Sequence, residues 1–194
     1  MKRIIVGITG ATGSPLAVKL LQFMQDLNIE THLVISQWAK VTLQQEAGIS
    51  YRQVCELASK TYDIRDQGAA ISSGSFITEG MIIVPCSMKT LASIRIGFAE
   101  NLISRAADVI LKERRKLLLV PRETPLSSIH LENMLHLSNL GATIFPPTPA
   151  FYNQPESIDA LLDHLAVRIL DQFQLSHPAA KRWSGMNHDS HQGV

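Results

Sequence analysis

The stretch that decides the fold is "IIVGITGATGSPLAV", residues 4–18. Its first three residues are β-branched, and a short apolar run of this kind is typical of a strand buried on both faces. Gly7, Gly10 and Gly13 follow, and a helical stretch begins at residue 14, with apolar residues at helical spacing from Leu16 onward. A strand that passes through a glycine-rich turn into a helix predicts the first unit of a βαβ fold.

The rest of the chain repeats the alternation of strand and helix. We expect strands at 3–8, 31–36, 80–87, 116–123 and 142–147, and helices at 14–26, 37–46, 51–59, 88–95, 100–113, 127–139 and 155–173. Segments 60–79 and 174–194 have no clear period and are expected to be irregular. This pattern predicts an α/β fold with a Rossmann-like, doubly wound, mostly parallel sheet in three α/β/α layers. We expect one domain over residues 1–175 and a polar tail over 176–194, in which Trp183 could dock on a neighbouring subunit.

Composition excludes several classes of protein. The 194 residues are 45% hydrophobic, with 18 basic against 17 acidic side chains, so a broad nucleic-acid surface is not expected. Cys55 and Cys86 lie far apart and form no metal-binding pair. No apolar run approaches the roughly 20 residues of a membrane span, and the first residues show no signal-peptide pattern. We therefore expect a cytoplasmic protein without a metal, a membrane contact or a nucleic-acid partner.

Polar residues and residues of special geometry follow the predicted strands. They are Gly10, Ala11 and Thr12 after the first strand, Ser36 after the second, 85–89 and 121–123 after the next two, and 146–147 after the last. In parallel sheets ligands bind beyond the carboxyl ends of the strands. The sequence therefore predicts one shared cleft at this edge.

The glycine turn indicates the class of ligand less clearly than the strand ends indicate its position. Its spacing is not G-x-G-x-x-G, and it lacks the Lys-Ser/Thr pair of nucleotide-triphosphate loops. We expect free N–H groups at the start of the following helix, with the Thr12 hydroxyl, to face an anion. The second strand ends in Ser36 and not in an acidic residue, which favours a single phosphate or a ring system over a dinucleotide. A tight turn without any ligand remains the alternative.

Five motifs carry a family resemblance. They are "GITGATG" (7–13), "VPCSMKTLASI" (84–94), "SRAADVILKERRKL" (104–117), "LVPRETPLSSIHLENMLHLSNLGA" (119–142) and "PAFYNQP" (149–155). In this order they resemble the UbiX family of flavin prenyltransferases, from residue 3 to about 184. "ISSGSF" (71–76) and "CSMK" (86–89) are similar to the branch associated with aromatic-acid decarboxylases.

The resemblance implies an activity and its partners. Members bind flavin mononucleotide (FMN) and transfer a dimethylallyl group from dimethylallyl monophosphate to reduced FMN, without a metal. The prenylated FMN serves a separate UbiD-type decarboxylase. A large closed homo-oligomer, a dodecamer, is also implied.

The resemblance also implies site residues. The catalytic residues would be Glu123, Thr12 and Glu46. The flavin-binding residues would be Gly10, Ala11, Thr12, Ser36, Ser87, Met88, Lys89, Thr90 and Arg122. The prenyl phosphate would be held by Arg105, Lys112, Tyr152 and Arg168.

The residues themselves leave other readings open. Arg105 and Lys112 stand two helical turns apart and could face one phosphate, but they could equally be solvated helix charges. Arg168 could be a surface residue and Tyr152 a core residue. Thr12 replaces the serine of many members, and Gln67 lies near the place of an aromatic residue in others.

Two rival functions share the expected fold. One is an FMN-dependent decarboxylase of the cysteine-decarboxylase type, although the strand end reads "PCSMKTLA" where that class carries P-x-M-N-x-x-M. The other is a non-catalytic FMN-binding subunit of a decarboxylase.

Overall fold

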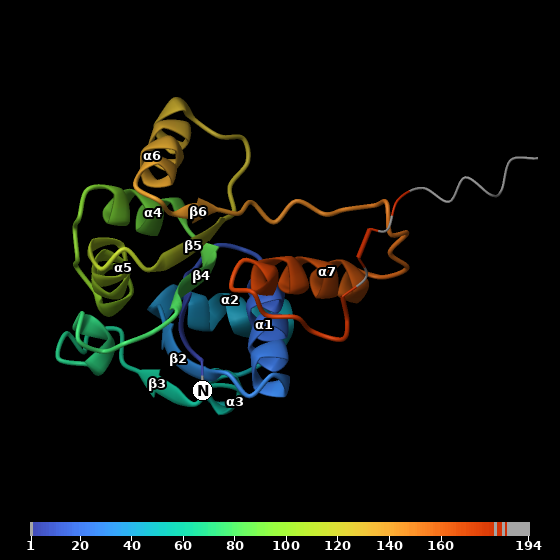
Figure 1. The fold of residues 1–194 in the computed structure, drawn as a ribbon, viewed down its shortest axis with the longest axis horizontal. Coiled ribbons are helices and arrows are strands. Elements are labelled where there is room, and N and C mark those ends of the chain that lie inside the picture. The colour runs from blue at the N-terminus through green and yellow to red at the C-terminus, as the bar shows by residue number, and fades with distance from the viewer. Residues whose placement is uncertain (1, 181, 184, 186–194) are drawn as a thin grey trace, which may run out of the picture.

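The centre of the molecule is a six-stranded sheet in the order β3-β2-β1-β4-β5-β6 (Figure 1). The computed structural model describes residues 2–180, 182, 183 and 185. The strands are β1 (Arg3–Ile8), β2 (Glu30–Ile35), β3 (Lys60–Tyr62), β4 (Gly80–Cys86), β5 (Lys116–Pro121) and β6 (Thr143–Ile144). Every neighbouring pair is parallel, which confirms the predicted fold class. The order reverses between β1 and β4, and this switch point is where open α/β sheets bind ligands.

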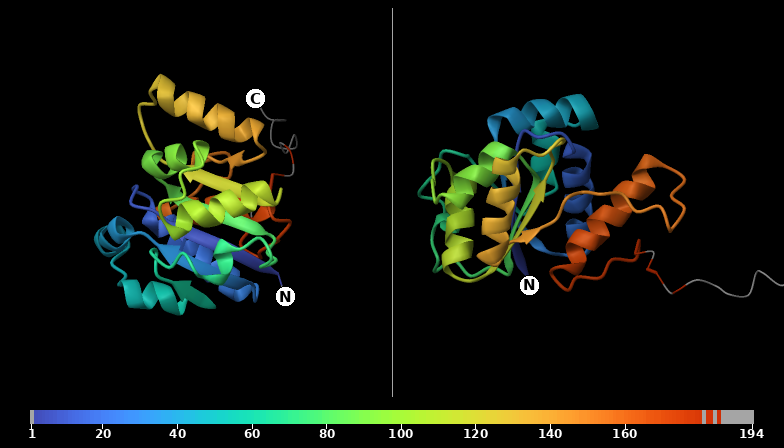
Figure 2. Two further views of the ribbon diagram at one scale, coloured as in Figure 1. Left: turned by 90° about the vertical axis from the view of Figure 1, so that its left-hand side faces the viewer. Right: turned by 90° about the horizontal axis from the view of Figure 1, so that it is seen from above.

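Helices cover both faces of the sheet (Figure 2). The first face packs against α1 (Ser14–Asp26), α2 (Gln37–Ala47), α3 (Tyr51–Glu56) and α7 (Ile158–Asp171). The second face packs against α4 (Met88–Arg95), α5 (Leu102–Lys112), α6 (Ser128–Asn139) and the 3₁₀ turn η1 (Ala70–Ser72). β1 serves both faces because its side chains alternate: Ile4 and Val6 join the first core, and Ile5 joins the second.

Two strands differ from the sequence-based expectation. Residues 60–62 were expected to be irregular, but they form the edge strand β3, in which only Tyr62 is buried. So short a strand carries no apolar run that a pattern could detect. The last strand was expected over 142–147 and covers only Thr143–Ile144, because Pro146 and Pro147 have no N–H to donate to a ladder.

The start of the predicted polar tail packs on its own chain. The His177 ring stacks on Phe23 of α1 with 3.8 Å between centroids, and its Nε2 lies 3.4 Å from Asp26 Oδ2. Residues 181, 184 and 186–194 lie outside the described part, and docking of the tail on a neighbour stays a prediction.

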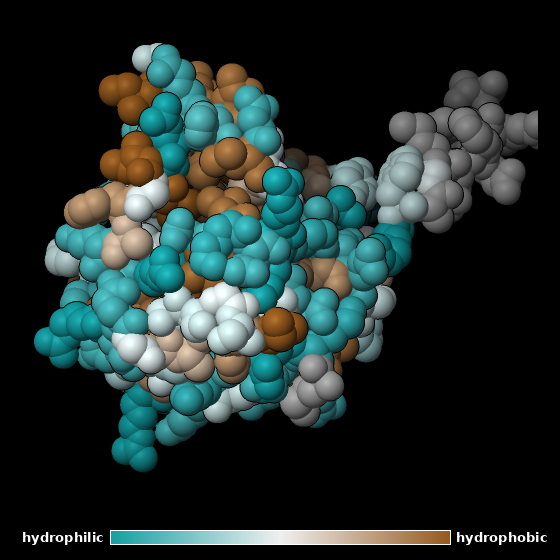
Figure 3. Space-filling model, turned by 60° about the vertical axis from the view of Figure 1, so that its left-hand side comes forward, coloured by the Kyte–Doolittle hydropathy of each residue, from teal (hydrophilic) through white to brown (hydrophobic). Residues whose placement is uncertain are grey.

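An apolar surface covers α6, which stands out from the body (Figure 3). Ile129, Leu131 and Leu135 on this helix are exposed, and Leu126 and Leu140 flank it. Apolar side chains gathered in this way typically mark an interaction surface. Within the described ranges, none of the helices combines the length and apolar character that crossing a membrane requires.

Candidate active site

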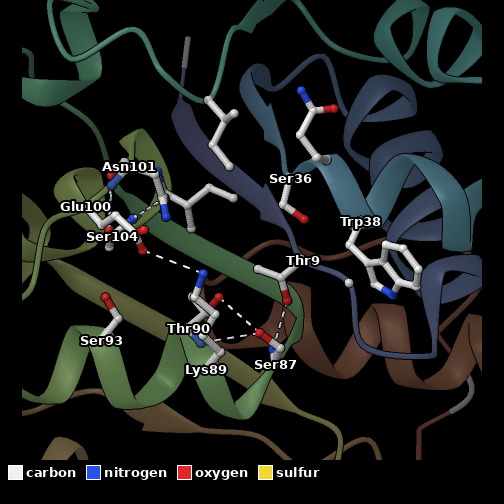
Figure 4. Close-up of a pocket in the computed structure, with 14 residues that line it drawn as sticks. Thr9, Ser36, Trp38, Ser87, Lys89, Thr90, Ser93, Glu100, Asn101 and Ser104 are labelled. Atoms are coloured by element: carbon white, nitrogen blue, oxygen red, sulfur yellow. Dashed lines mark hydrogen bonds and ion pairs between the residues drawn. The ribbon is translucent and has the colours of Figure 1, made fainter.

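A cavity of about 460 Å³ opens at the carboxyl edge of the sheet, beside the ends of β1, β2 and β4 (Figure 4). The first turns of α2 and α4 line it, and each begins at a serine that caps the helix. The Ser36 hydroxyl accepts from Ala39 N at 3.2 Å, and the Ser87 hydroxyl accepts from Thr90 N at 3.3 Å. Two helix N-termini with their hydroxyls therefore face one cavity, which suits an anionic group.

A buried threonine joins two edges of this cavity. Thr9 Oγ1 donates to Pro85 O at 2.7 Å and accepts from Ser87 N at 2.8 Å. It thereby fixes the end of β1 against the start of α4. Sequence reasoning missed Thr9, although a polar residue inside the turn "ITGAT" was the available signal.

Gly10 allows the indole of Trp38 to lie directly against the glycine turn. A Cβ atom at position 10 would collide with the Cβ and the ring of Trp38. Trp38 is 67% exposed and lines the cavity, so it offers an aromatic wall for a planar ligand. Trp38 was absent from the sequence-based site because an aromatic residue on the first turn of a helix is usually packed in the core.

The start of α1 differs from the sequence-based expectation. The N–H groups of Gly13 and Ser14 were expected to be free for an anion, but both donate to Glu46 Oε2 at 2.9 Å. The Ser14 hydroxyl donates to the same oxygen at 2.8 Å. Burial raises the pKa of Glu46, but hydrogen bonds from Thr12, Gly13 and Ser14 outweigh it, and the pKa lies below its usual value. A carboxylate from α2 therefore already fills the anion position at this helix end.

A second cavity, of about 230 Å³, lies at the carboxyl ends of β4 and β5, between the glycine turn after β1 and the helices α1 and α7. Thr12, Pro85 and Arg122 contribute to its wall, and Arg122 N donates to Cys86 O at 3.3 Å. Glu123 is exposed, and its Oε1 accepts from Thr124 N at 3.1 Å.

The predicted flavin-binding residues thus divide between the two cavities. Gly10, Ser36, Ser87, Lys89 and Thr90 line the first, and Thr12 and Arg122 line the second, whereas Ala11 and Met88 line neither.

The predicted phosphate-binding residues lie on opposite faces of the sheet. On α5, Arg105 Nη1 pairs with Asp108 Oδ2 at 2.8 Å, and Lys112 Nζ pairs with Glu113 Oε1 at 2.5 Å. The other pair, Tyr152 and Arg168, lines a third cavity of about 250 Å³ beside α7. Tyr152 and Arg168 therefore share a cavity, whereas Arg105 and Lys112 share α5 but line none of the three cavities. One chain does not bring the two pairs together, because α5 packs in the second core and α7 in the first.

Comparison with known proteins places the chain in a family. Residues 1–169 match the sequence profile of the family described as Flavoprotein. A probable UbiX-like flavin prenyltransferase from Streptomyces sp. (strain D7) is 60% identical over 95% of this chain and 92% of its own length.

Solved structures agree with the sequence relatives. A UbiX protein in complex with FMN and dimethylallyl pyrophosphate has a TM-score of 0.95 at 53% identity, covering 96% of this chain and 99% of its own. A dodecameric FMN-dependent UbiX-like decarboxylase from Escherichia coli O157:H7 has a TM-score of 0.93 at 59% identity, covering 94% of this chain and 100% of its own. By contrast, the peptidyl-cysteine decarboxylase EpiD is 16% identical, with a TM-score of 0.57, and shares the fold alone. The chain therefore belongs to the flavoprotein family and, within it, to the UbiX-like flavin prenyltransferases.

Proposed function

We propose that this protein is a flavin prenyltransferase that transfers a dimethylallyl group from an allylic phosphate to reduced FMN. The observation that carries this proposal is the cavity between the N-termini of α2 and α4, in a chain that shares more than half of its residues with named flavin prenyltransferases. Its volume falls within the roughly 300–1,000 Å³ of small-molecule sites. When bound, reduced FMN supplies the nucleophilic nitrogen and ring carbon that accept the allyl group.

The residues of the first cavity fit a flavin monophosphate. Ser36, Ser87 and Thr90 offer hydroxyls, and the first turns of both helices add backbone N–H donors. Lys89 brings a cation, and its Nζ lies 3.6 Å from Glu100 Oε2. The Trp38 indole adds an apolar plane at the same cavity. Hydroxyls and N–H groups for a phosphate, beside an aromatic wall for a ring, match the two parts of FMN.

Cations at the donor site stabilise the departing phosphate. As the allylic C–O bond breaks, negative charge accumulates on the leaving group, and preorganised positive charge lowers that barrier. Arg105, Lys112 and Arg168 would supply this charge and Tyr152 a hydroxyl donor. Holding the allyl carbon next to its acceptor supplies much of the remaining rate enhancement.

We propose that the complete donor site forms between subunits of a homo-oligomer. The two halves of the phosphate site lie on opposite faces of one chain, so a neighbour must bring them together. The exposed apolar surface of α6, with Ile96 and Phe98 at the end of α4, supplies area for subunit contacts. A dodecamer, as in the E. coli relative, is the assembly we propose. Light scattering should give a mass far above the 21.4 kDa of one chain, and a fully active monomer would contradict the shared site.

Three residues are proposed to move or hold protons. Glu123 is exposed at the carboxyl end of β5, where its carboxylate can accept the proton that alkylation releases. Glu46 is held ionised by its donors and lies next to Thr12, so these two residues would form a second route.

The expected product indicates which protein would use it. Prenylated FMN would pass to a UbiD-type decarboxylase acting on aromatic acids. We also propose a cytoplasmic location, which the free thiols of Cys55 and Cys86 support because such thiols persist in a reducing compartment.

One experiment separates this function from its rivals. The protein is incubated anaerobically with reduced FMN and dimethylallyl monophosphate, or with the pyrophosphate in a parallel sample, and the flavin is analysed by mass spectrometry. A prenyltransferase adds one dimethylallyl unit to the flavin. A carrier subunit returns FMN unchanged with both donors. A cysteine decarboxylase also leaves the flavin without a dimethylallyl unit, but in a separate sample with oxidised FMN and a peptide that ends in cysteine it releases CO₂ as the flavin is reduced.

A further inference from the structure

Asp171, the last residue of α7, joins two guanidinium groups at the third cavity. Its Oδ2 accepts from Arg168 Nη1 at 3.1 Å and from Arg182 Nη1 at 3.2 Å, and its Oδ1 accepts from Arg182 Nη2 at 2.7 Å. The Asp171 side chain is only 15% exposed. A bidentate guanidinium is the stronger partner for a carboxylate, so Arg182 is the principal partner of Asp171.

The charges of this cluster matter because the same cavity holds Tyr152 and Arg168. A pair formed by Arg168 and Asp171 alone would be neutral and would attract a phosphate poorly. With Arg182 the cluster carries one net positive charge. Burial and the neighbouring Arg168 lower the pKa of His164, so its imidazole is neutral at pH 7 and adds no charge. The positive charge of the cavity therefore depends on the second arginine.

The segment that carries Arg182 makes a second contact at the third cavity. The next residue, Trp183, packs edge-on against Tyr152, with 5.4 Å between ring centroids. Among the residues that the structure describes, Arg168 donates only to Asp171, through Nη1, so its other guanidinium donors face no described acceptor and suit a ligand.

We propose that Arg182 is a positioning residue for the donor phosphate: it neutralises Asp171 and so leaves the charge of Arg168 available to the allylic phosphate. This inference rests on the proposed function. It adds a residue from the C-terminal segment to the donor site, and it assigns Asp171 the role of the carboxylate that holds both arginines.

The test compares the wild type, Arg182→Ala and a double variant in single-turnover assays at saturating reduced FMN, with dimethylallyl monophosphate varied. Arg182→Ala should raise the half-saturating donor concentration about five- to twentyfold, since a charge-assisted contact is weakened at a partly exposed site. The maximal rate should stay within about twofold. Asp171→Asn combined with Arg182→Ala should return the half-saturating concentration to within about threefold of wild type, because no carboxylate remains to neutralise Arg168.

The outcomes separate charge balance from other roles. If the double variant is as weak as Arg182→Ala alone, Arg182 acts as a direct ligand or a structural brace, and the proposal is overturned. An unchanged half-saturating concentration in Arg182→Ala overturns it as well. Arg52→Ala is the matched control, because Arg52 forms an exposed ion pair with Glu56 on α3 and lines none of the cavities described.

A second measurement needs no turnover. Inorganic phosphate binding is measured by calorimetry on the wild type and the same variants, in the oligomer as purified. The proposal expects weaker binding in Arg182→Ala and recovery in the double variant, whereas equal binding in all three contradicts it. Phosphate binding that follows this pattern in a protein that forms no prenylated FMN would count against the proposed function alone.

Discussion

Glu46, near the end of α2, caps the start of α1 at Ser14: its Oε2 accepts hydrogen bonds from both the N–H and the hydroxyl of Ser14. Because the donors that begin α1 are used in this way, Glu46 stabilises the glycine turn that borders the cavities. Glu46→Ala should lower the free energy of unfolding by about 1–3 kcal/mol, since buried donors lose their partner. Urea denaturation at a fixed protomer concentration measures this.

Glu46→Gln provides the companion measurement. It keeps an oxygen acceptor but loses the charge, so its loss of stability should be smaller than that of Glu46→Ala. Equal losses in the two variants would show that the hydrogen bonds themselves contribute little.

Gly10→Ala should weaken flavin binding and also lower stability. The new methyl group collides with the Cβ of Trp38 as well as its ring, so the indole must move and the backbone at the start of α2 must shift with it. The displaced ring would then either enter the cavity or leave its wall open. We expect FMN affinity to fall about tenfold, equivalent to about 1.4 kcal/mol. Quenching of flavin fluorescence on titration gives the affinity. Unchanged FMN affinity would mean that this face of Trp38 does not bound the flavin.

Glu123→Gln should separate chemistry from binding. If the carboxylate accepts the proton released on alkylation, its loss should slow formation of prenylated FMN by about 10²–10⁴-fold while FMN binding is kept. Single-turnover rates at saturating donor measure the effect. Glu132→Gln, an exposed change on α6, serves as the control. A wild-type rate in Glu123→Gln would move the acid–base role to Thr12, Glu46 or the substrate phosphate.

Arg168→Ala and Tyr152→Phe should act on donor binding. Loss of charge-assisted hydrogen bonds should weaken the binding of dimethylallyl monophosphate by about 1.5–3 kcal/mol for Arg168→Ala, and by the lower end or less for Tyr152→Phe. The readout is the donor concentration for half-maximal rate. A fall in the maximal rate alone, without a change in that concentration, would exclude a role in holding the ground-state phosphate.

Stability should fall on acidification because of a buried histidine. His32 Nδ1 lies 2.8 Å from Tyr62 Oη and its Nε2 lies 2.9 Å from Glu30 Oε1. Burial lowers the pKa of His32, although Glu30 opposes this, so the unfolded chain binds more protons as pH falls through 6.5. Hydrogen bonds from Arg3 and His32 lower the pKa of Glu30 below its usual value of 4.5. The contribution of Glu30 to folding stability is therefore present above pH 4.5 and is lost as the pH falls further.

Both effects have the same sign. The His32 contribution should appear as a loss of unfolding free energy between pH 7 and 5, with a slope of at most about 1.4 kcal/mol per pH unit for one proton. His32→Gln should reduce that slope, as urea titrations at several pH values would measure. A slope identical to wild type would assign the acid sensitivity to other groups.

The sequence predicts the layered fold because its signals are local. The runs that became β1, β4 and β5 are short and apolar, and the glycine turn marks the first crossover. Edge strands escape this reasoning, since β3 pairs through its backbone and buries one side chain. β6 shows the opposite error, because an apolar pattern does not reveal that two prolines end the ladder.

The site is harder to predict because its contacts are made across the chain. Hydroxyl residues after strands indicate where the cavity lies, and Ser36 and Ser87 are found there. No pattern reveals that Glu46 reaches 32 positions back to Ser14, or that Thr9 holds Ser87. The resemblance supplies Arg105 and Tyr152 together, but only the fold shows that one subunit holds them on opposite faces.

The position of Trp38 has an optical consequence. The chain holds two tryptophans, and the structure places Trp38 on the wall of the first cavity and Trp183 on the wall of the third. Oxidised flavin absorbs in the region where indole emits, so an occupied first cavity will quench the emission of Trp38 by energy transfer. In Trp183→Phe the remaining emission comes from the wall of the first cavity alone, and in Trp38→Phe from the wall of the third alone. Each of the two cavities proposed to bind a substrate thus carries its own intrinsic fluorophore.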